Sequence, residues 1–513
     1  MKLIYFFLGN FKKGYKFEEV FRLEQKNSLN AMYCIIISLA LGIIFDKFFF
    51  YGNIGVSYSV YTALCIIFFL WSAKSEIKLE KNIGWFLMIP IALIAFSYTV
   101  YTNEVFMVLN FLVVPGLMII SSVLIYNPKI KWDKINFVFY LVRKGIVDVL
   151  EGIGSAFNTA GKGFKRVGKK EKNSNRNQII IGLIISIPII AVVVMLLSSA
   201  DMIFNYYLNN ITRIFDYIDL SNAVPHIIII GIITFYLLGY VWSFKIERKQ
   251  QEDKDELEAV NLEALVFITV LTVMNGLYLI FILIQFSYLY GGEGMVLPSN
   301  FTYAEYARRG FFELVAVTII NFVIILGCLK YAKKENEVLL KVLNILLTVL
   351  ILFTVNMLYS ANFKLSLYES SFGYTYLRVF VHLFMILLFI LCIITLAGIW
   401  NRKIPVMKSI IITTVIAYTI ANYLNIDAFI AKKNIERYYS TGKLDAPYLN
   451  SLSYEVVPLI LDMKNIKDIS IQGVINEGLK YRKEELQKNK SLGEFNFSRR
   501  KAQKLLENMG EKK

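Results

Sequence analysis

Residues 377–399 read LRVFVHLFMILLFILCIITLAGI, and only Arg378 and His382 among them can carry a charge. An α-helix rises about 1.5 Å per residue and the hydrocarbon core of a bilayer is about 30 Å thick, so this stretch predicts a membrane-spanning helix. The whole chain has the same bias, because 56% of its 513 residues are hydrophobic and only 18% are charged. A soluble core could not bury so much apolar surface, whereas lipid accepts it.

Further stretches of the same apolar character occur along the chain. They cover residues 29–45, 56–72, 84–101, 105–126, 179–199, 224–244, 262–290, 311–329, 338–359 and 407–424. The sequence therefore predicts an all-α, polytopic membrane protein with about eleven transmembrane helices.

The orientation follows from the basic residues, because loops rich in Lys and Arg stay on the cytoplasmic side. With the N-terminus inside, the inner segments hold 30 Lys and Arg and the outer loops hold 5. This predicts an N-in, C-out arrangement in the cell membrane. The chain then divides into a cytoplasmic N-terminal segment (1–28), spans one to four (29–126), a basic cytoplasmic connector (127–178), spans five to eleven (179–424) and an extracytoplasmic helical tail (425–513).

The connector contains an amphipathic stretch, residues 135–172, whose apolar residues recur at helical spacing before a run of Lys and Arg. This pattern predicts a helix that lies on the anionic lipids of the inner leaflet. A solvated basic connector that merely obeys the orientation rule would show the same charges. Both interpretations remain open from the sequence.

Ionisable residues gather at the predicted outer ends of the spans, and such residues are costly in lipid unless they are paired or hydrated. The candidates for a binding site are Asp201, Arg308, Arg309, Glu313, Arg378 and His382, with Asp46, His226 and Glu369 nearby in the predicted topology. Structural interpretations compete with each candidate. Arg309 and Glu313 are four residues apart and could pair along one helix face. Asp201 could simply end its helix, and the two histidines could be hydrogen-bonded interfacial side chains.

Polar residues also occur inside the spans, where Asn110, Asn275, Asn321 and Asn356 favour hydrogen bonds between helices over ligand binding. The chain has no Walker loop, no HExxH, no GxSxG and no dinucleotide fingerprint. Its four cysteines lie in apolar stretches without a CxxC pair, so we expect no metal and no cofactor. The net charge of +16 is scattered between apolar stretches, which argues against a nucleic-acid partner.

Several strings together resemble a known family. They are LLSSADMIF (196–204), YAEYARRGFFELVAV (303–317), LYESSFGYTYLRVFV (367–381) and NIDAFIAKKNIERYYSTGKLDAPYLNSLSYEVVPLI (425–460). The chain resembles a family of bacterial polytopic membrane proteins, domain of unknown function four-one-seven-three, which has a sister family numbered four-one-five-three. The resemblance implies a membrane protein and supplies no activity.

Two functions remain in competition. The first is a non-enzymatic protein that binds or transports a solute, a lipid or an envelope partner through the outer polar cluster and the tail. The second is a membrane-embedded transferase that acts on a lipid-linked substrate at the outer face. Asp46, Asp201 and Glu313 would then be candidate bases, and the three candidate arginines would hold phosphate. The absence of catalytic motifs favours the first function.

Overall fold

The computed structural model describes residues 29–50, 52, 54–74, 82–167, 201, 203, 220–246, 263–289, 311–332, 336–464, 466–488 and 492–511. Regular secondary structure in these ranges is entirely helical. The prediction of an all-α polytopic membrane protein is therefore confirmed.

Nine helices in the described ranges are long and apolar enough to cross a bilayer. They are Leu29–Phe49, α2 (Val56–Ala73), α3 (Ile83–Val100), α4 (Glu104–Tyr126), α9 (Leu220–Ser243), α10 (Ala264–Leu289), α12 (Phe311–Tyr331), α13 (Glu337–Phe372) and α14 (Tyr376–Trp400). A tenth candidate is α15 (Val406–Ala421) together with α16 (Ile426–Thr441), a pair bent by 62°. The remaining predicted span, 179–199, lies outside the described residues.

The outward-facing surface of these helices is apolar, as expected of helices that lipid solvates. Only 17% of the apolar stretch of α10 is buried inside the protein. Val273 and Leu283 on this helix are 68% and 62% exposed. A soluble protein would bury such side chains, whereas a membrane protein turns them toward the hydrocarbon.

The chain forms two compact units. Unit 1 comprises residues 1–100, 107–249 and 489–496. Besides its spans it contains α5 (Ile135–Val142), the π-helical η1 (Arg143–Val147), α6 (Asp148–Val167) and the short η4 (Leu492–Glu494). The C-terminal segment joins this unit through a hydrogen bond of 2.9 Å from Val56 N to Phe495 O and one of 2.8 Å from Asn496 Nδ2 to Tyr98 O.

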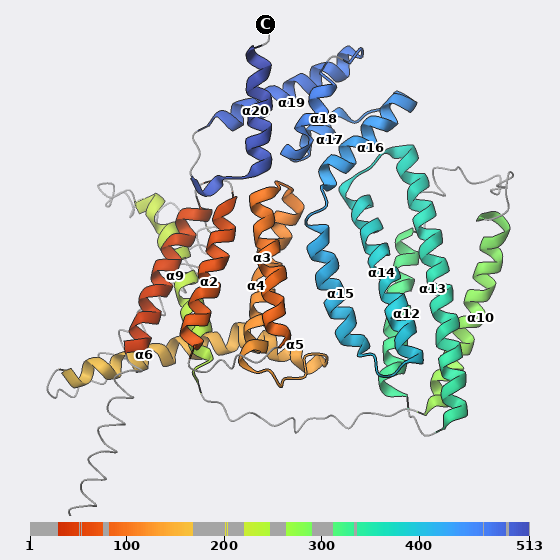
Figure 1. Cartoon of the computed structure of the whole chain (residues 1–513), viewed down its shortest axis with the longest axis horizontal. Helices are drawn as coiled ribbons and strands as arrows, with labels where there is room; N and C mark the ends of the chain where they lie inside the picture. The colour runs from red at the N-terminus through yellow and green to blue at the C-terminus, as the bar shows by residue number, and fades with distance from the viewer. Residues whose placement is uncertain are drawn as a thin grey trace, which may run out of the picture. The chain divides into compact units, whose positions relative to one another are not determined.

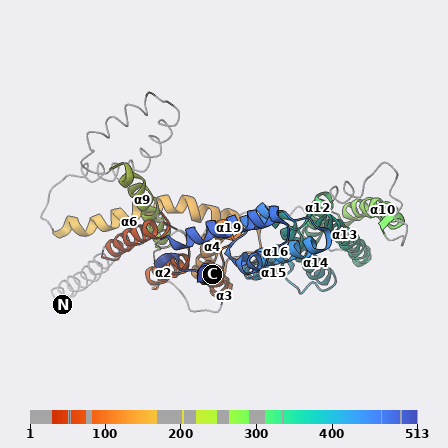
Figure 2. The same cartoon turned by 90° about the horizontal axis from the view of Figure 1, so that it is seen from above.

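Unit 2 comprises residues 101–106, 250–488 and 497–513. Here α13 packs against α10, α12 and α14, which lie beside it in both views (Figures 1 and 2). The buried residues of these spans form one apolar core that includes Leu347, Leu350 and Leu365.

The tail is helical, and all of it except residues 489–496 belongs to unit 2, where it lies beyond the ends of α13 and α14 (Figure 1). It consists of α16, α17 (Ala446–Ser451), η3 (Tyr454–Val456), α18 (Val457–Asp462), α19 (Ile469–Gln487) and α20 (Phe497–Glu511). Its own core includes Ile430, Val457 and Ile475, and it also takes in Phe106 and Val379. The loop between α3 and α4 and the start of α14 therefore lie at the same end of unit 2 as the tail.

Candidate functional site at the end of α13

The last turns of α13 are polar, although the rest of the helix is apolar. The helix has 36 residues. At 1.5 Å per residue it is roughly 54 Å long, well beyond the 30 Å or so of a hydrocarbon core. Residues 360–373, SANFKLSLYESSFG, occupy the end of this excess length. The helix can therefore present side chains such as Glu369 close to the membrane surface.

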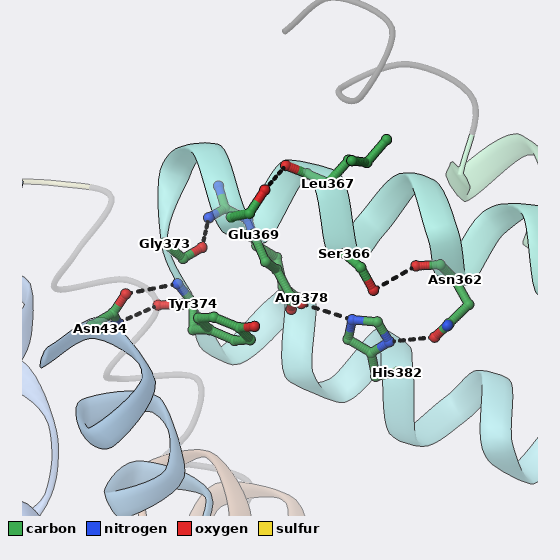
Figure 3. Close-up of polar contacts among 10 residues, drawn as sticks. Asn362, Ser366, Leu367, Glu369, Gly373, Tyr374, Arg378, His382 and Asn434 are labelled. Carbon is green, nitrogen blue, oxygen red and sulfur yellow. Dashed lines mark hydrogen bonds and ion pairs between the residues drawn. The ribbon is translucent and has the colours of Figure 1, made fainter. Parts of the chain in front are cut away.

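A carboxylate, an imidazole and an amide meet on the side of α13 that faces α14 (Figure 3). His382 Nε2 lies 2.9 Å from Glu369 Oε2, and His382 Nδ1 lies 2.8 Å from Asn362 Oδ1. The Glu369 side chain is only 2% exposed. Its second oxygen, Oε1, is buried and has no hydrogen-bond partner among the described residues. A buried carboxylate oxygen without a donor is costly, so this atom marks a place where a donor group could bind.

The turn between α13 and α14 is held by polar contacts from both of its sides (Figure 3). Arg378 donates a hydrogen bond to Gly373 O, and its guanidinium lies 4.2 Å from the Tyr368 ring centroid. Gly373 has a φ of +83°, and a Cβ there would lie 2.6 Å from Asn434 Oδ1. Both requirements explain why this position is glycine.

Side chains of α16 complete this turn. Asn434 accepts a hydrogen bond from Tyr374 N and donates one to Tyr374 O, each of 2.8 Å. Arg437 donates to Ser370 O at 3.0 Å and to Ser371 O at 2.6 Å, which satisfies carbonyls that the end of α13 leaves without helical partners. Burial and the negative charge of Glu369 raise the pKa of Tyr374. The tail thus contacts the same turn that carries the carboxylate and imidazole pair.

A second polar group lies on the other side of α13, toward α10 and α12. Gln285 Nε2 donates to Ser360 Oγ at 2.9 Å, and Gln285 Oε1 is buried without a hydrogen-bond partner among the described residues. Lys364 follows one turn after Ser360 and is 8% exposed. Its charge interacts with that of Glu313 on α12. Acidic, basic and amide groups therefore converge from three helices.

Deeper in the spans, the polar side chains connect helices to one another. Tyr278 OH donates to Asn321 Oδ1 at 2.7 Å, and Asn321 Nδ2 donates to Thr354 Oγ1 at 2.9 Å. Asn275 Nδ2 donates to Leu346 O at 3.0 Å. These contacts agree with the predicted role of the mid-span amides in joining helices.

The structure brings together some of the predicted site residues. Arg378 and His382 belong to α14 and contact Gly373 and Glu369 at the end of α13, and Glu313 on α12 interacts with the charge of Lys364. Asp201 belongs to unit 1, where it is exposed and its Oδ1 accepts a hydrogen bond of 2.7 Å from Ile203 N. Arg308 and Arg309 lie outside the described residues. In unit 1, His226 Nδ1 lies 2.6 Å from Asp46 Oδ1, which is the hydrogen-bonded state expected of an interfacial histidine.

Several residues of the site were not among the sequence candidates. Asn362, Asn434 and Arg437 are ordinary polar residues whose importance comes from their partners. The sequence offered one indication for two of these residues. Asn434 and Arg437 occur in one of the four strings that resemble the family, and their partners at Ser370–Tyr374 occur in another. In the described ranges, no group of three or more His, Cys, Asp or Glu side chains is placed to hold a metal ion.

Comparison with known proteins adds a family without an activity. A family model described as "Domain of unknown function (DUF4153)" matches residues 88–463. This confirms the prediction of a family of unknown function, and the matching family is the one that the resemblance had given as the sister. No curated protein and no solved structure matches the chain.

Proposed function

We propose, from the premise that this chain belongs to the DUF4153 family of unknown function, that it binds a small polar solute at the end of α13. The chain is a multi-pass integral membrane protein, and we place it in the cytoplasmic membrane with this end outside. That placement rests on the distribution of Lys and Arg among its loops.

One observation carries the proposal, namely the second oxygen of Glu369. The side chain is 2% exposed and its Oε1 has no hydrogen-bond partner among the described residues, while its Oε2 is paired with His382. Most buried polar atoms in proteins have a hydrogen-bond partner, so this oxygen is a place where a donor from outside the protein could bind. A solute with an amine or hydroxyl group would supply the absent donor.

The surroundings agree with an amine- or hydroxyl-bearing solute. Glu369 Oε1 can accept a hydrogen bond from such a group, and His382 holds the other oxygen of the same carboxylate in place. Arg378 is already engaged with the Gly373 carbonyl and the Tyr368 ring, so we assign it to positioning the turn.

The test uses the full chain in lipid nanodiscs, with ethanolamine, glucosamine and spermidine as probes in thermal-shift titrations. We expect at least one probe to raise the melting temperature. Glu369→Gln should weaken its binding roughly tenfold to a hundredfold, since a hydrogen bond to a charged group is worth about 1.5–3 kcal/mol. Glu337→Gln, at the exposed other end of α13, is the matched control. If no probe stabilises the protein, or if Glu369→Gln binds as the wild type does, the proposal fails.

A second function, a membrane-embedded transferase for a lipid-linked substrate, is favoured by a different observation in unit 1. Asp46 and His226 form a pair of 2.6 Å, and the Phe50 ring lies 4.0 Å from the imidazole centroid. A carboxylate that orients an imidazole is a common general-base arrangement. Under this function Asp46→Asn would abolish turnover of a lipid-linked donor, whereas solute binding at Glu369 would be unchanged.

The tail gives a further proposal about partners. Placed outside, residues 425–513 would meet components of the cell envelope, and we propose that the tail binds one of them. A reporter fused after the tail tests the placement: activity of an export-dependent reporter agrees with it, and activity of a cytoplasmic reporter contradicts it.

A further inference from the structure

The element formed by α5, η1 and α6 runs across the lower ends of α2, α3 and α4 in unit 1 (Figure 1). Lys144 anchors it. The Lys144 ammonium donates to Ser243 O at 3.0 Å, lies 4.0 Å from the Phe244 ring centroid and lies 3.7 Å from Asp148 Oδ2. This buried lysine therefore ties the element to the C-terminal end of α9.

A second anchor follows two turns later, where two glycines bring the helix backbones into contact. A Cβ on Gly152 would overlap Gly239 O, and a Cβ on Gly239 would overlap Val149 O. Small residues of this kind allow close packing of helices in membranes. Together with Lys144, this contact fixes which face of α6 points toward the spans.

The face that points away from the spans contains an apolar row. Val142, Ile146 and Leu150 follow one another at intervals of four residues and are 55%, 62% and 68% exposed, and Phe139, 70% exposed, extends the row. Glu151 and Asn158 lie exposed on another side of the same helix. The helix thus has one face for the spans, one for hydrocarbon and one for water, as an interfacial helix does.

Positively charged residues precede this row and occur within it. Lys129, Lys131 and Lys134 are exposed just before α5. Within the row the Arg143 side chain is 54% exposed. A protein partner could cover the apolar row, but the combination of an apolar row at the ends of membrane spans with flanking cations complements an anionic phospholipid.

We propose that α5, η1 and α6 form a binding surface for anionic phospholipids of the inner leaflet. The acyl chains cover the row Phe139–Leu150 and the headgroups contact Lys129, Lys131 and Lys134. This surface belongs to unit 1 and is independent of the solute site proposed in unit 2.

The first experiment measures how deeply two positions of α5, η1 and α6 lie in the membrane. A nitroxide is attached to the full chain through Ile146→Cys or Glu151→Cys, and the protein is reconstituted into vesicles of phosphatidylglycerol and phosphatidylcholine. The described native cysteines are buried, so the label goes to the new cysteine. We expect the label at Ile146 to collide several-fold more with oxygen than with a water-soluble nickel complex, and the label at Glu151 to show the opposite ratio. Equal ratios at both positions would overturn the proposal, and so would shielding of Ile146 from both reagents, which would indicate a protein partner.

The second experiment measures lipid preference with spin-labelled phosphatidylglycerol and phosphatidylcholine. Replacing Lys129, Lys131 and Lys134 together by Gln should reduce the preference for phosphatidylglycerol roughly fivefold or more, because each cation near the surface contributes to attraction of anionic lipid. The same replacement of three exposed tail lysines, Lys467, Lys480 and Lys488, is the control and should leave the preference unchanged. An unchanged preference in the first triple variant, or free inorganic phosphate competing as well as the lipid does, would refute the lipid assignment.

Discussion

Replacing Asp427 by Ala should release the tail from the spans of unit 2. Asp427 lies in the first turn of α16 and is 1% exposed. It accepts hydrogen bonds from Asn103 Nδ2 at 2.5 Å, from Ser453 N at 3.0 Å and from the Tyr376 hydroxyl. These donors come from the loop between α3 and α4, from the tail and from the start of α14. Alanine leaves three donors without the acceptor that joins them.

The magnitude follows from the number and kind of these bonds. A hydrogen bond to a charged group contributes about 1.5–3 kcal/mol, and a buried donor left unsatisfied costs a similar amount. Loss of only two of the three contacts would destabilise the docked tail by roughly 3–6 kcal/mol. Because about 1.4 kcal/mol corresponds to a factor of ten, the population with an open tail should rise roughly a hundredfold or more.

Limited trypsin digestion of the full chain in nanodiscs measures this population, because cleavage tracks the open form when reclosing is fast. Lys432 and Lys443 provide cleavage sites in the tail. The control is Asp462→Ala, since Asp462 is exposed and belongs to the same tail. If Asp427→Ala is cut at the wild-type rate in 425–460, the hydrogen-bond network does not hold the tail and the reasoning is wrong.

Three further predictions concern the same end of unit 2. Gly373→Ala should destabilise the protein by about 1–2 kcal/mol in thermal unfolding, because Gly373 has a positive φ and the new Cβ would lie 2.6 Å from Asn434 Oδ1. Gly276→Ala is the control and should cause no such loss of stability, since a Cβ there would meet open space. Arg437→Met should speed amide hydrogen exchange in the last turn of α13, since two carbonyls there lose their donors; unchanged exchange would exclude the capping role. Burial and the Glu485 carboxylate raise the pKa of Tyr454, so the folded tail favours the neutral phenol. This contribution is complete below the unfolded value of about 10 and is lost as pH rises above it, so Tyr454→Phe should make unfolding less dependent on pH in that range.

The spans were largely predictable because transfer of a side chain into lipid is a property of each residue and its sequence neighbours. The predicted span 377–399 is α14, Tyr376–Trp400. The predicted span 338–359 begins correctly but ends early, since α13 continues to Phe372. Hydropathy falls where SANFKLSLYESSF begins, yet helical hydrogen bonds continue through these polar residues. The boundary of the apolar stretch and the boundary of the helix are different physical quantities.

The candidate site was predictable only in part. Arg378 and His382 are four residues apart on one helix, and their position near the outer end of a span was enough to select them. Glu369, the partner of His382, was noted beside them, but the other contacts of this turn were not predicted. The contact of Asn434 with Tyr374 joins residues 60 positions apart, and neither side chain is unusual in its own segment. Asp201 met the same sequence criterion as Arg378, and its described contact is a local hydrogen bond with Ile203 N.

From the sequence alone follow the helical class, the approximate course of the spans and the expected sidedness, because these depend on apolar length and on charge summed over short segments. Only the tertiary structure shows that Glu369 meets His382, that α16 holds the turn after α13, and that Lys144 and Gly152 orient an interfacial helix. The physical reason is that these contacts join residues that are far apart in the sequence. A hydrogen bond requires two atoms within about 3.5 Å, and which distant segments approach so closely is decided by the packing of the whole unit.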